Sequence, residues 1–395
     1  MKKKILSMGL CVALTASLFA GCGANGGAAT STETVDTSGE LTWRLGGIGP
    51  ITGGAAQYGQ GVMNAIQIAV DEVNEAGGIN GYKVSFNFQD DETDPQKAVN
   101  AYNTLKDWGM QILEGTVTSG ACAAVSAETY NDRIFQLTPS ASSTSVTEGH
   151  DNTFQICFSD PNQGTVSADY IAENSLGTKI GIIYDSSDPY SSGVYQNFAK
   201  EAANVGLEIV ATEAFTADNK TDFSTQLQKC KDAGADLLFL PFYYQEGSVV
   251  LKQAHDMSYA PIMFGVDGFD GLLGVKDFDV SLAEGVYLLT PFAADATDDA
   301  TKNFVTKYEE QFGGTPNQFA ADAYDGVYIL KEALEASGLT PEASNEEICE
   351  ALIGAIQNVN YNGLTGEGMT WNEKGEVSKS PKAVIIENGG YVSVQ

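Results

Sequence analysis

Two hydroxyl-rich turns carry residue types that could bind a carboxylate. Gly115-Thr116-Val117-Thr118-Ser119-Gly120 follows one expected strand and precedes a helix, and Thr138-Pro139-Ser140-Ala141-Ser142-Ser143 follows the next strand. In a doubly wound sheet, ligands bind where the carboxyl ends of strands meet helix N-termini. Both turns offer hydroxyls and open backbone N–H groups, which suit one carboxylate without an arginine. Taken alone, each turn is better explained by helix caps and turn formers.

An acid and two tyrosines extend this pattern. Asp267, in Gly265-Val266-Asp267-Gly268, lies just past an expected strand, where its carboxylate could pair with an ammonium group. Tyr190 and Tyr243 also follow expected strands, and each by itself would be a surface aromatic. Together, hydroxyl turns, one acid and tyrosines at strand ends predict a pocket for an amino acid.

Nucleotide and calcium sites have weaker support. The glycine-rich segment Gly46–Gly54 lies between a strand and a helix, but Thr52 stands where a dinucleotide loop needs its third glycine. We expect this loop to bring Gln57 and Tyr58 to the strand ends instead. The acidic segment Asp90–Asp94 lacks the glycine and closing glutamate of a calcium loop. Its residues instead predict the end of a strand followed by a helix cap.

Enzyme chemistry is poorly supported, and no cofactor or metal is expected. The two histidines, His150 and His255, are far apart, and no GxSxG, HExxH, SxxK or P-loop motif is present. An exported hydrolase stays open as an alternative and would need a nucleophile–base pair. The four cysteines beyond residue 22 are widely spaced and are expected to be buried small hydrophobes, although the sequence does not show whether they pair. They are Cys122, Cys157, Cys230 and Cys349.

The acidic net charge of the chain limits the kinds of molecule that it is expected to bind. The net charge is −31, from 52 acidic and 21 basic residues, so nucleic-acid binding is not expected. Arg44 and Arg133 are the only arginines, which argues against a heavily anionic ligand.

The N-terminus predicts export and a membrane tether. Residues 1–22 hold three lysines, an apolar run and small residues, the pattern of a signal peptide. Leu18–Cys22 resembles a bacterial lipobox, which implies lipidation of Cys22, although Phe19 stands where an aliphatic residue is usual. The alternative is an ordinary cleaved signal with an incidental cysteine. Residues 23–40 are rich in Gly, Ala, Ser and Thr and are expected to form a flexible linker.

The rest of the chain alternates between strands and helices, which predicts an α/β fold with parallel sheets wrapped by helices. Asp94 and Pro95 are expected to begin a helix as its cap and first residue. The expected strands are 41–48, 82–88, 111–114, 134–137, 180–184, 208–215, 237–241, 261–264, 285–290, 369–372, 383–386 and 391–394. The expected helices are 61–76, 96–107, 121–130, 163–174, 193–205, 223–233, 247–257, 301–311, 319–336 and 345–356.

From Leu41 onward the chain resembles a known family, the type I periplasmic binding proteins that serve branched-chain amino acid (Leu/Ile/Val) ABC transporters. The order and spacing of several stretches carry the resemblance. They are Pro50-Ile51-Thr52-Gly53 with Gln57-Tyr58-Gly59, Asn74–Gly81, Asp90-Asp91 with Asp94-Pro95, Thr138-Pro139-Ser140-Ala141, Phe158-Ser159-Asp160 with Gln163-Gly164, and Thr370–Gly375.

The resemblance implies two doubly wound α/β lobes joined by a hinge of three crossing segments and closing on a ligand between them. The N-terminal ligand-binding lobe would comprise residues 41–160 plus 291–366, and the C-terminal lobe residues 161–290 plus 367–395. It also implies a monomer that binds an aliphatic amino acid and delivers it to an ABC permease outside the cytoplasm, tethered to the membrane by its lipid anchor. An alternative keeps the fold but changes the ligand to an amide, a urea-like compound or a small aromatic acid.

The resemblance also assigns site residues. The ligand carboxylate would bind Ser119 and Ser142, and the ammonium group the Ser140 carbonyl, the Ser142 hydroxyl and Asp267. Ala141 belongs to the same ligand turn, Tyr190 and Tyr243 would cover the ligand from the second lobe, and Tyr58 and Phe319 would line its side-chain pocket.

The chain departs from the family at several of these positions. Relatives often have Glu where Asp267 stands, and Ser140 replaces a small apolar residue. Thr93 and Thr118 occupy the positions of a disulfide that some relatives carry, so this bridge is absent.

Overall fold

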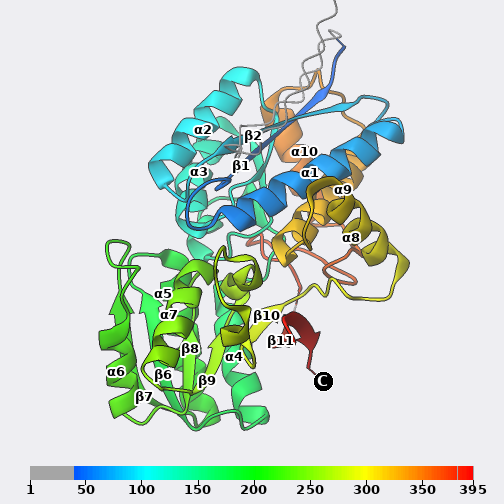
Figure 1. The fold of residues 1–395 in the computed structure, drawn as a ribbon. Coiled ribbons are helices and arrows are strands. Elements are labelled where there is room, and N and C mark those ends of the chain that lie inside the picture. The colour runs from blue at the N-terminus through cyan, green and yellow to red at the C-terminus, as the bar shows by residue number, and fades with distance from the viewer. Residues whose placement is uncertain (1–39, 380, 395) are drawn as a thin grey trace, which may run out of the picture. The chain divides into compact units, whose positions relative to one another are not determined.

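Two sheets organise the computed structural model, which describes residues 40–379 and 381–394 (Figure 1). The expected signal peptide, its Cys22 and all but the last residue of the expected linker lie outside the described residues. Within the described part of the chain, no helix combines the length and hydropathy that crossing a membrane requires.

The first sheet has five parallel strands in the order β2-β1-β3-β4-β5. Nearly all residues of its strands are buried, polar ones included, as expected for a parallel sheet covered on both faces. Helices from two distant parts of the chain cover it, and α1 packs against α9. The strands are β1 (Trp43–Gly49), β2 (Val84–Asp90), β3 (Ile112–Gly115), β4 (Phe135–Thr138) and β5 (Thr153–Gln155). The helices on this side are α1 (Ala56–Glu75), α2 (Pro95–Trp108), α3 (Ser119–Asp132), α8 (Asp299–Phe312), α9 (Gln318–Ser337), α10 (Asn345–Ile356) and the short η1 (Thr144–Val146).

The second sheet has seven strands in the order β12-β11-β10-β9-β8-β6-β7. Five are parallel, and the C-terminal pair β11 and β12 adds an antiparallel edge. Its strands are β6 (Lys179–Asp185), β7 (Glu208–Phe215), β8 (Leu237–Leu240), β9 (Ile262–Gly265), β10 (Tyr287–Thr290), β11 (Lys382–Glu387) and β12 (Gly390–Ser393). Its helices are α4 (Asp160–Glu173), α5 (Pro189–Val205), α6 (Ser224–Asp232), α7 (Tyr244–Asp256) and the short η2 (Asp267–Phe269), η3 (Leu272–Gly274) and η4 (Val280–Ala283).

The α/β class with parallel sheets is confirmed. As expected, Asp94 caps α2, because its Oδ1 accepts hydrogen bonds from the N–H groups of Gln96 and Lys97 at 2.8 and 2.9 Å. All four described cysteines are buried free thiols, as expected for small hydrophobes.

The expected strand at 369–372 is wrong. Met369 and Trp371 form only isolated bridges, to Tyr361 and Val377, and no regular ladder. The Trp371 indole instead donates a 2.7 Å hydrogen bond to the Gln155 carbonyl, so this segment is held by its side chain. The three-residue β5 was not expected, because it is too short to show a strand periodicity.

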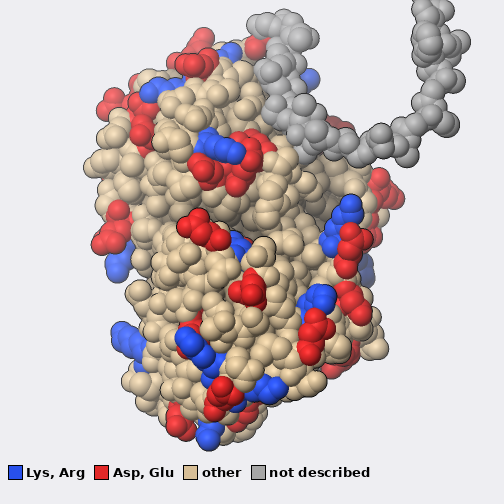
Figure 2. Space-filling model, turned by 60° about the vertical axis from the view of Figure 1, so that its left-hand side comes forward, with Lys and Arg blue, Asp and Glu red and all other residues tan. Residues whose placement is uncertain are grey.

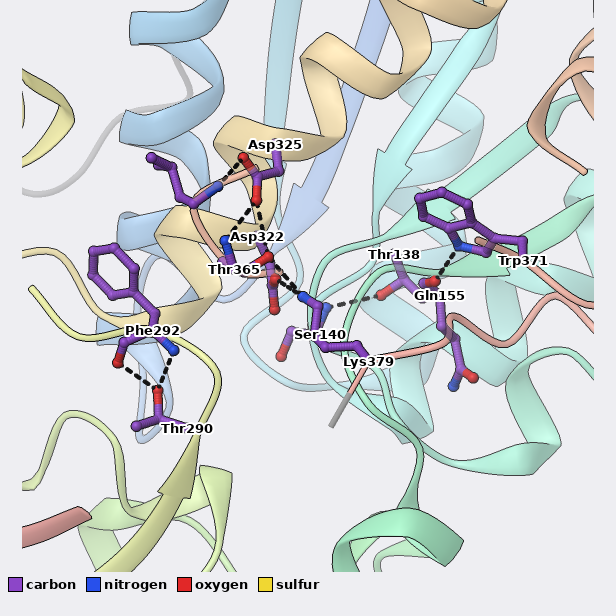
Figure 3. A network of polar contacts seen from close by, with 11 residues as sticks. Thr138, Ser140, Gln155, Thr290, Phe292, Asp322, Asp325, Thr365, Trp371 and Lys379 are labelled. Atoms are coloured by element: carbon purple, nitrogen blue, oxygen red, sulfur yellow. Dashed lines mark hydrogen bonds and ion pairs between the residues drawn. The ribbon is translucent and has the colours of Figure 1, made fainter. Parts of the chain in front are cut away.

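A buried ion pair anchors the C-terminal segment near the crossings between the two sheets (Figure 3). The Lys379 ammonium donates to Oδ1 of Asp322 on α9 and, at 2.7 Å, to the hydroxyl of Thr365. Thr365 in turn donates to Asp325 from its N–H and hydroxyl at 3.0 and 2.9 Å. Residues 365–379 therefore contact the first-sheet side, although residues from 367 onward were expected in the C-terminal lobe. The exact lobe boundaries stay a prediction.

Candidate ligand-binding site

Eleven residues from both sheets surround one small cavity. Their positions follow from topology, because several come directly after the carboxyl ends of β3, β4 and β9. They are Tyr58, Val117, Thr118, Ser119, Ser140, Ser142, Tyr190, Tyr243, Asp267, Gly268 and Phe319. Eight of the nine expected ligand residues are in this set, whereas Ala141 lies behind it, packed with Cys122 and Val146.

The cavity is almost filled by its own side chains. Its free space is about 10 Å³, roughly room for one water molecule. Hollows of about 870 and 860 Å³ lie between α9 and α10 and beside α1, α8 and β12, but neither gathers the hydroxyl turns and Asp267. An amino acid can therefore enter the small cavity only when the two halves part or the tyrosine rings turn.

The hydroxyl turns meet at the N-terminus of α3. Ser119 Oγ accepts hydrogen bonds of 3.2 Å from the N–H groups of Ser142 and Ser143, which ties the two turns together. Thr118 caps α3 without a side-chain hydrogen bond, and its Oγ1 and Ser142 Oγ are buried with no partner among the described residues. Buried hydroxyls without partners cost about 1–3 kcal/mol each, and the first-turn N–H groups of a helix attract anions. This end of the cavity suits a carboxylate.

The cavity also contains an acid that could bind a positively charged group. This acid is Asp267, which is only 2 % exposed. Its Oδ1 accepts a 2.7 Å hydrogen bond from the Tyr190 hydroxyl, and its Oδ2 accepts one of 2.9 Å from Gln163 Nε2. Burial raises the pKa of Asp267 to about 7, against the lowering effect of these two donors. No described Lys, Arg or His forms an ion pair with it. A ligand ammonium would supply the missing positive charge.

Aromatic rings form the remaining walls. Tyr190 stacks on Tyr243 with ring centroids 5.3 Å apart, and Tyr58 meets Phe319 edge-on at 4.7 Å. Burial raises the pKa of Tyr58, Tyr190 and Tyr243 well above the usual value, so their hydroxyls stay neutral donors. The walls are therefore uncharged apart from Asp267.

Hydrogen bonds also join the two halves across the cavity. The Tyr58 hydroxyl, on α1, donates to the Gly268 carbonyl, and the Gln57 N–H donates to the Tyr244 hydroxyl at 3.1 Å. These contacts connect the first-sheet side to segments that follow β8 and β9. The structure is therefore in a closed arrangement.

Sequence reasoning assigned no site role to Gln163, Thr118, Val117 or Gly268. Gln163 is fully buried on α4, and its Oε1 also accepts the Asp267 N–H at 3.4 Å. Gly268 is required sterically, since a Cβ there would lie 2.6 Å from the Phe242 carbonyl oxygen and the Tyr190 hydroxyl. The signals available in the sequence were the hydroxyl-rich turn that contains Thr118 and the polar type of Gln163.

Comparisons with known proteins agree on the family. The family model described as periplasmic binding protein matches residues 42–388. The Leu/Ile/Val-binding protein homolog 3 of Brucella melitensis is 29 % identical over 301 residues, which span 76 % of this chain and 80 % of the relative. A leucine-, isoleucine-, valine-, threonine- and alanine-binding protein of Pseudomonas aeruginosa is 27 % identical, covering 77 % of this chain and 80 % of its own.

Solved structures give the same fold. The branched-chain amino acid transporter substrate-binding protein LivJ of Streptococcus pneumoniae, in complex with isoleucine, is 27 % identical with a TM-score of 0.80, covering 89 % of this chain and 98 % of its own. A solute-binding protein of Rhodopseudomonas palustris in complex with 3,4-dihydroxybenzoic acid has a TM-score of 0.79 at 22 % identity, covers 90 % of this chain and 96 % of its own, and supports the fold alone. The resemblance read from the sequence is confirmed, and the chain belongs to the periplasmic binding protein family, with the type I fold of branched-chain amino acid transporter binding proteins.

Proposed function

We propose that this protein binds an aliphatic, branched-chain amino acid between its two lobes and delivers it to an ABC permease. The single observation that carries the proposal is the pairing of two opposite subsites around one cavity. Ser119, Ser142 and the N-terminus of α3 suit a carboxylate, and buried Asp267 suits an ammonium group. Charge-assisted hydrogen bonds of about 1.5–3 kcal/mol at each end would anchor the α-amino acid head.

The apolar wall supports an aliphatic side chain. Tyr58, Phe319 and Val117 line the cavity and are nearly inaccessible to solvent. They offer no charged group to a polar side chain, so a branched aliphatic group would gain most from burial here. LivJ of Streptococcus pneumoniae, whose structure contains isoleucine, shares this fold.

Asp267 argues against a simple aromatic acid. A ligand with a carboxylate but no cationic group would leave the buried Asp267 without a counter-charge, which is costly. The related structures that contain 3,4-dihydroxybenzoic acid and benzoate are 22 % and 18 % identical. The amide, urea-like and aromatic-acid alternatives keep the fold and change only the ligand.

The proposed role needs no catalytic step. Closure driven by contacts made only in the closed state would create the form that the permease recognises. The protein would work outside the cytoplasm as a monomer, tethered through a lipid on Cys22. On the face shown in Figure 2, Lys and Arg side chains are interspersed among Asp and Glu and form no broad basic patch, which supports partners other than nucleic acid.

Calorimetry with the twenty amino acids, benzoate and isoamylamine is the direct test. We expect leucine, isoleucine or valine to bind most tightly, with benzoate and the amine much weaker. If no amino acid binds at millimolar concentration, the assignment is wrong.

Turnover of an ester or peptide that disappears when one serine is mutated would instead favour the hydrolase. Mass spectrometry of the mature N-terminus tests the anchor, and an unmodified Cys22 would contradict it.

A further inference from the structure

Asp160 is a buried acid directly behind the proposed carboxylate subsite. It is the first residue of α4, is 1 % exposed, and its N–H donates a 2.9 Å hydrogen bond to the Ser142 carbonyl. Both of its carboxyl oxygens are buried without a hydrogen-bond partner among the described residues, and so is the Ser142 hydroxyl. Two adjacent polar groups therefore both lack a partner.

The surroundings of Asp160 favour the neutral acid. The charged groups that face it are Asp188, the cap of α5, and Asp267, and no described base forms an ion pair with it. Helix α5 closes the other side, because a side chain at Gly193 would collide with Asp160 Oδ2. Burial raises the pKa of Asp160 well above its usual value, although the nearby Ser142 and Ser143 hydroxyls oppose this shift. An isolated buried carboxylate neutralises in this way rather than stay charged.

We propose that Asp160 is a positioning residue of the carboxylate subsite. Its neutral carboxyl group makes no hydrogen bond with Ser142 Oγ in this structure, but would donate one to it when a ligand binds and so turn the Ser142 proton toward the ligand. The inference rests on the proposed function, because it assigns Ser142 to an amino acid's carboxylate.

Hydrogen-bond direction explains the effect. A serine hydroxyl has one proton and can give it to only one acceptor. An ionised Asp160 would compete with the ligand for that proton and would also repel its carboxylate. A neutral Asp160 offers a proton of its own, so Ser142 can accept from Asp160 and donate to the ligand. The relay makes binding depend on a donor at position 160 and not on a charge there.

Leucine binding to the full chain, measured by calorimetry in a double-mutant cycle, tests this relay. Asp160→Asn keeps a donor, so we expect leucine affinity within about threefold of wild type. Asp160→Ala removes the donor and should weaken leucine about tenfold, which is about 1.4 kcal/mol. In a Ser142→Ala background the same Asp160→Ala change should have almost no further effect, because the relay is already broken.

Glu114 provides a matched control. It is also fully buried with two unpaired oxygens, but it lies against Gly326 of α9 and outside the cavity. Glu114→Gln should leave leucine affinity unchanged.

Three results separate the inference from the proposed function. Additive effects of Asp160→Ala and Ser142→Ala would overturn the relay while leaving the receptor assignment intact. If Asp160→Ala proves unstable, Asp160→Asn alone decides, since a loss of tenfold or more would show that the charge is needed. Failure of the wild-type protein to bind any amino acid would instead reject the proposed function.

Discussion

The Tyr190 hydroxyl donates a 2.7 Å hydrogen bond to Oδ1 of Asp267, and it also accepts the Gly268 N–H at 3.0 Å. The phenol thus fixes the acid and the backbone that follows it. Gln163 holds the other carboxylate oxygen from α4. Asp267 is therefore oriented before a ligand arrives, which lowers the entropy that binding must spend on ordering it.

Tyr190→Phe should separate this orientation from ring packing. The variant keeps the ring stacked on Tyr243 but removes the hydroxyl, so leucine affinity should fall about tenfold, the effect of one hydrogen bond of about 1–1.5 kcal/mol. Calorimetry measures the change. Tyr184→Phe is the control, because Tyr184 stacks on Tyr195 outside the cavity and should bind leucine as wild type does. Equal effects of the two variants would show that the Tyr190 hydroxyl is unimportant.

Asp267→Asn should weaken leucine about 100-fold, because the ligand ammonium loses its charged partner. The same variant should not weaken benzoate, which has no cationic group. Since burial raises the pKa of Asp267 to about 7, its carboxyl group charges only at a cost in the ligand-free protein. Thermal unfolding without ligand at pH 8 should therefore show no loss of stability, which distinguishes weakened binding from misfolding. A parallel loss of leucine and benzoate binding would contradict this assignment.

The order of strands and turns in the sequence predicted much of the carboxylate subsite. Ser119 and Ser142 follow β3 and β4, and these strands are neighbours in a parallel sheet, so their turns must meet at one edge. The contact of Gln163 with Asp267 joins residues 104 positions apart and depends on how α4 packs after the chain crosses between sheets. No local periodicity encodes that packing. The glycine-rich loop predicted that Tyr58 lies at the strand ends, whereas the position of Phe319 came from the family resemblance alone.

Glycine explains the largest error at a helix boundary. The sequence placed the start of the first helix at Gly61, whereas α1 begins at Ala56 and includes Gly59. Glycine weakens helices, which argues for a later start. In the structure, a side chain at Gly59 would collide with the Pro50 carbonyl, so glycine permits close approach of the loop to the helix. This requirement is tertiary and is not visible in a propensity.

Lys379→Met should destabilise the protein by about 3–5 kcal/mol, because it leaves Asp322 buried without its counter-charge. Urea unfolding at pH 7.5 measures the loss. Burial raises the pKa of Asp322 to about 6 even beside Lys379, so the orphaned acid should protonate at low pH and the loss of stability should shrink at pH 5.

The double variant Lys379→Met/Asp322→Leu should recover much of the stability. Lys331→Met, which breaks a surface pair with Glu335, should cost less than about 1 kcal/mol. Similar losses for the two lysines would contradict a special role for the buried pair.

Asp91→Asn should stabilise the protein relative to wild type, increasingly so as pH rises from about 4 to 7. Asp91 is fully buried and its Oδ2 has no partner among the described residues, while Oδ1 accepts the Thr93 N–H at 2.9 Å. Burial raises the pKa of Asp91 to about 7 from an ordinary value of 3.8, and the charges of Asp90 and Asp94 add to the shift.

The sign follows from proton binding. Between these pH values the folded state of the wild type keeps a proton that the unfolded state has released, so its stability falls as pH rises and levels off above about 7. Asn cannot ionise, and its Oδ1 can still accept the Thr93 N–H. Urea unfolding at pH 4, 6 and 8 should give a difference on the order of 4 kcal/mol at pH 8 and little at pH 4. Glu373→Gln, which replaces an acid at an exposed position, is the control variant. A difference that stays constant with pH would mean that Asp91 ionises equally in both states, and its burial would then carry no electrostatic cost.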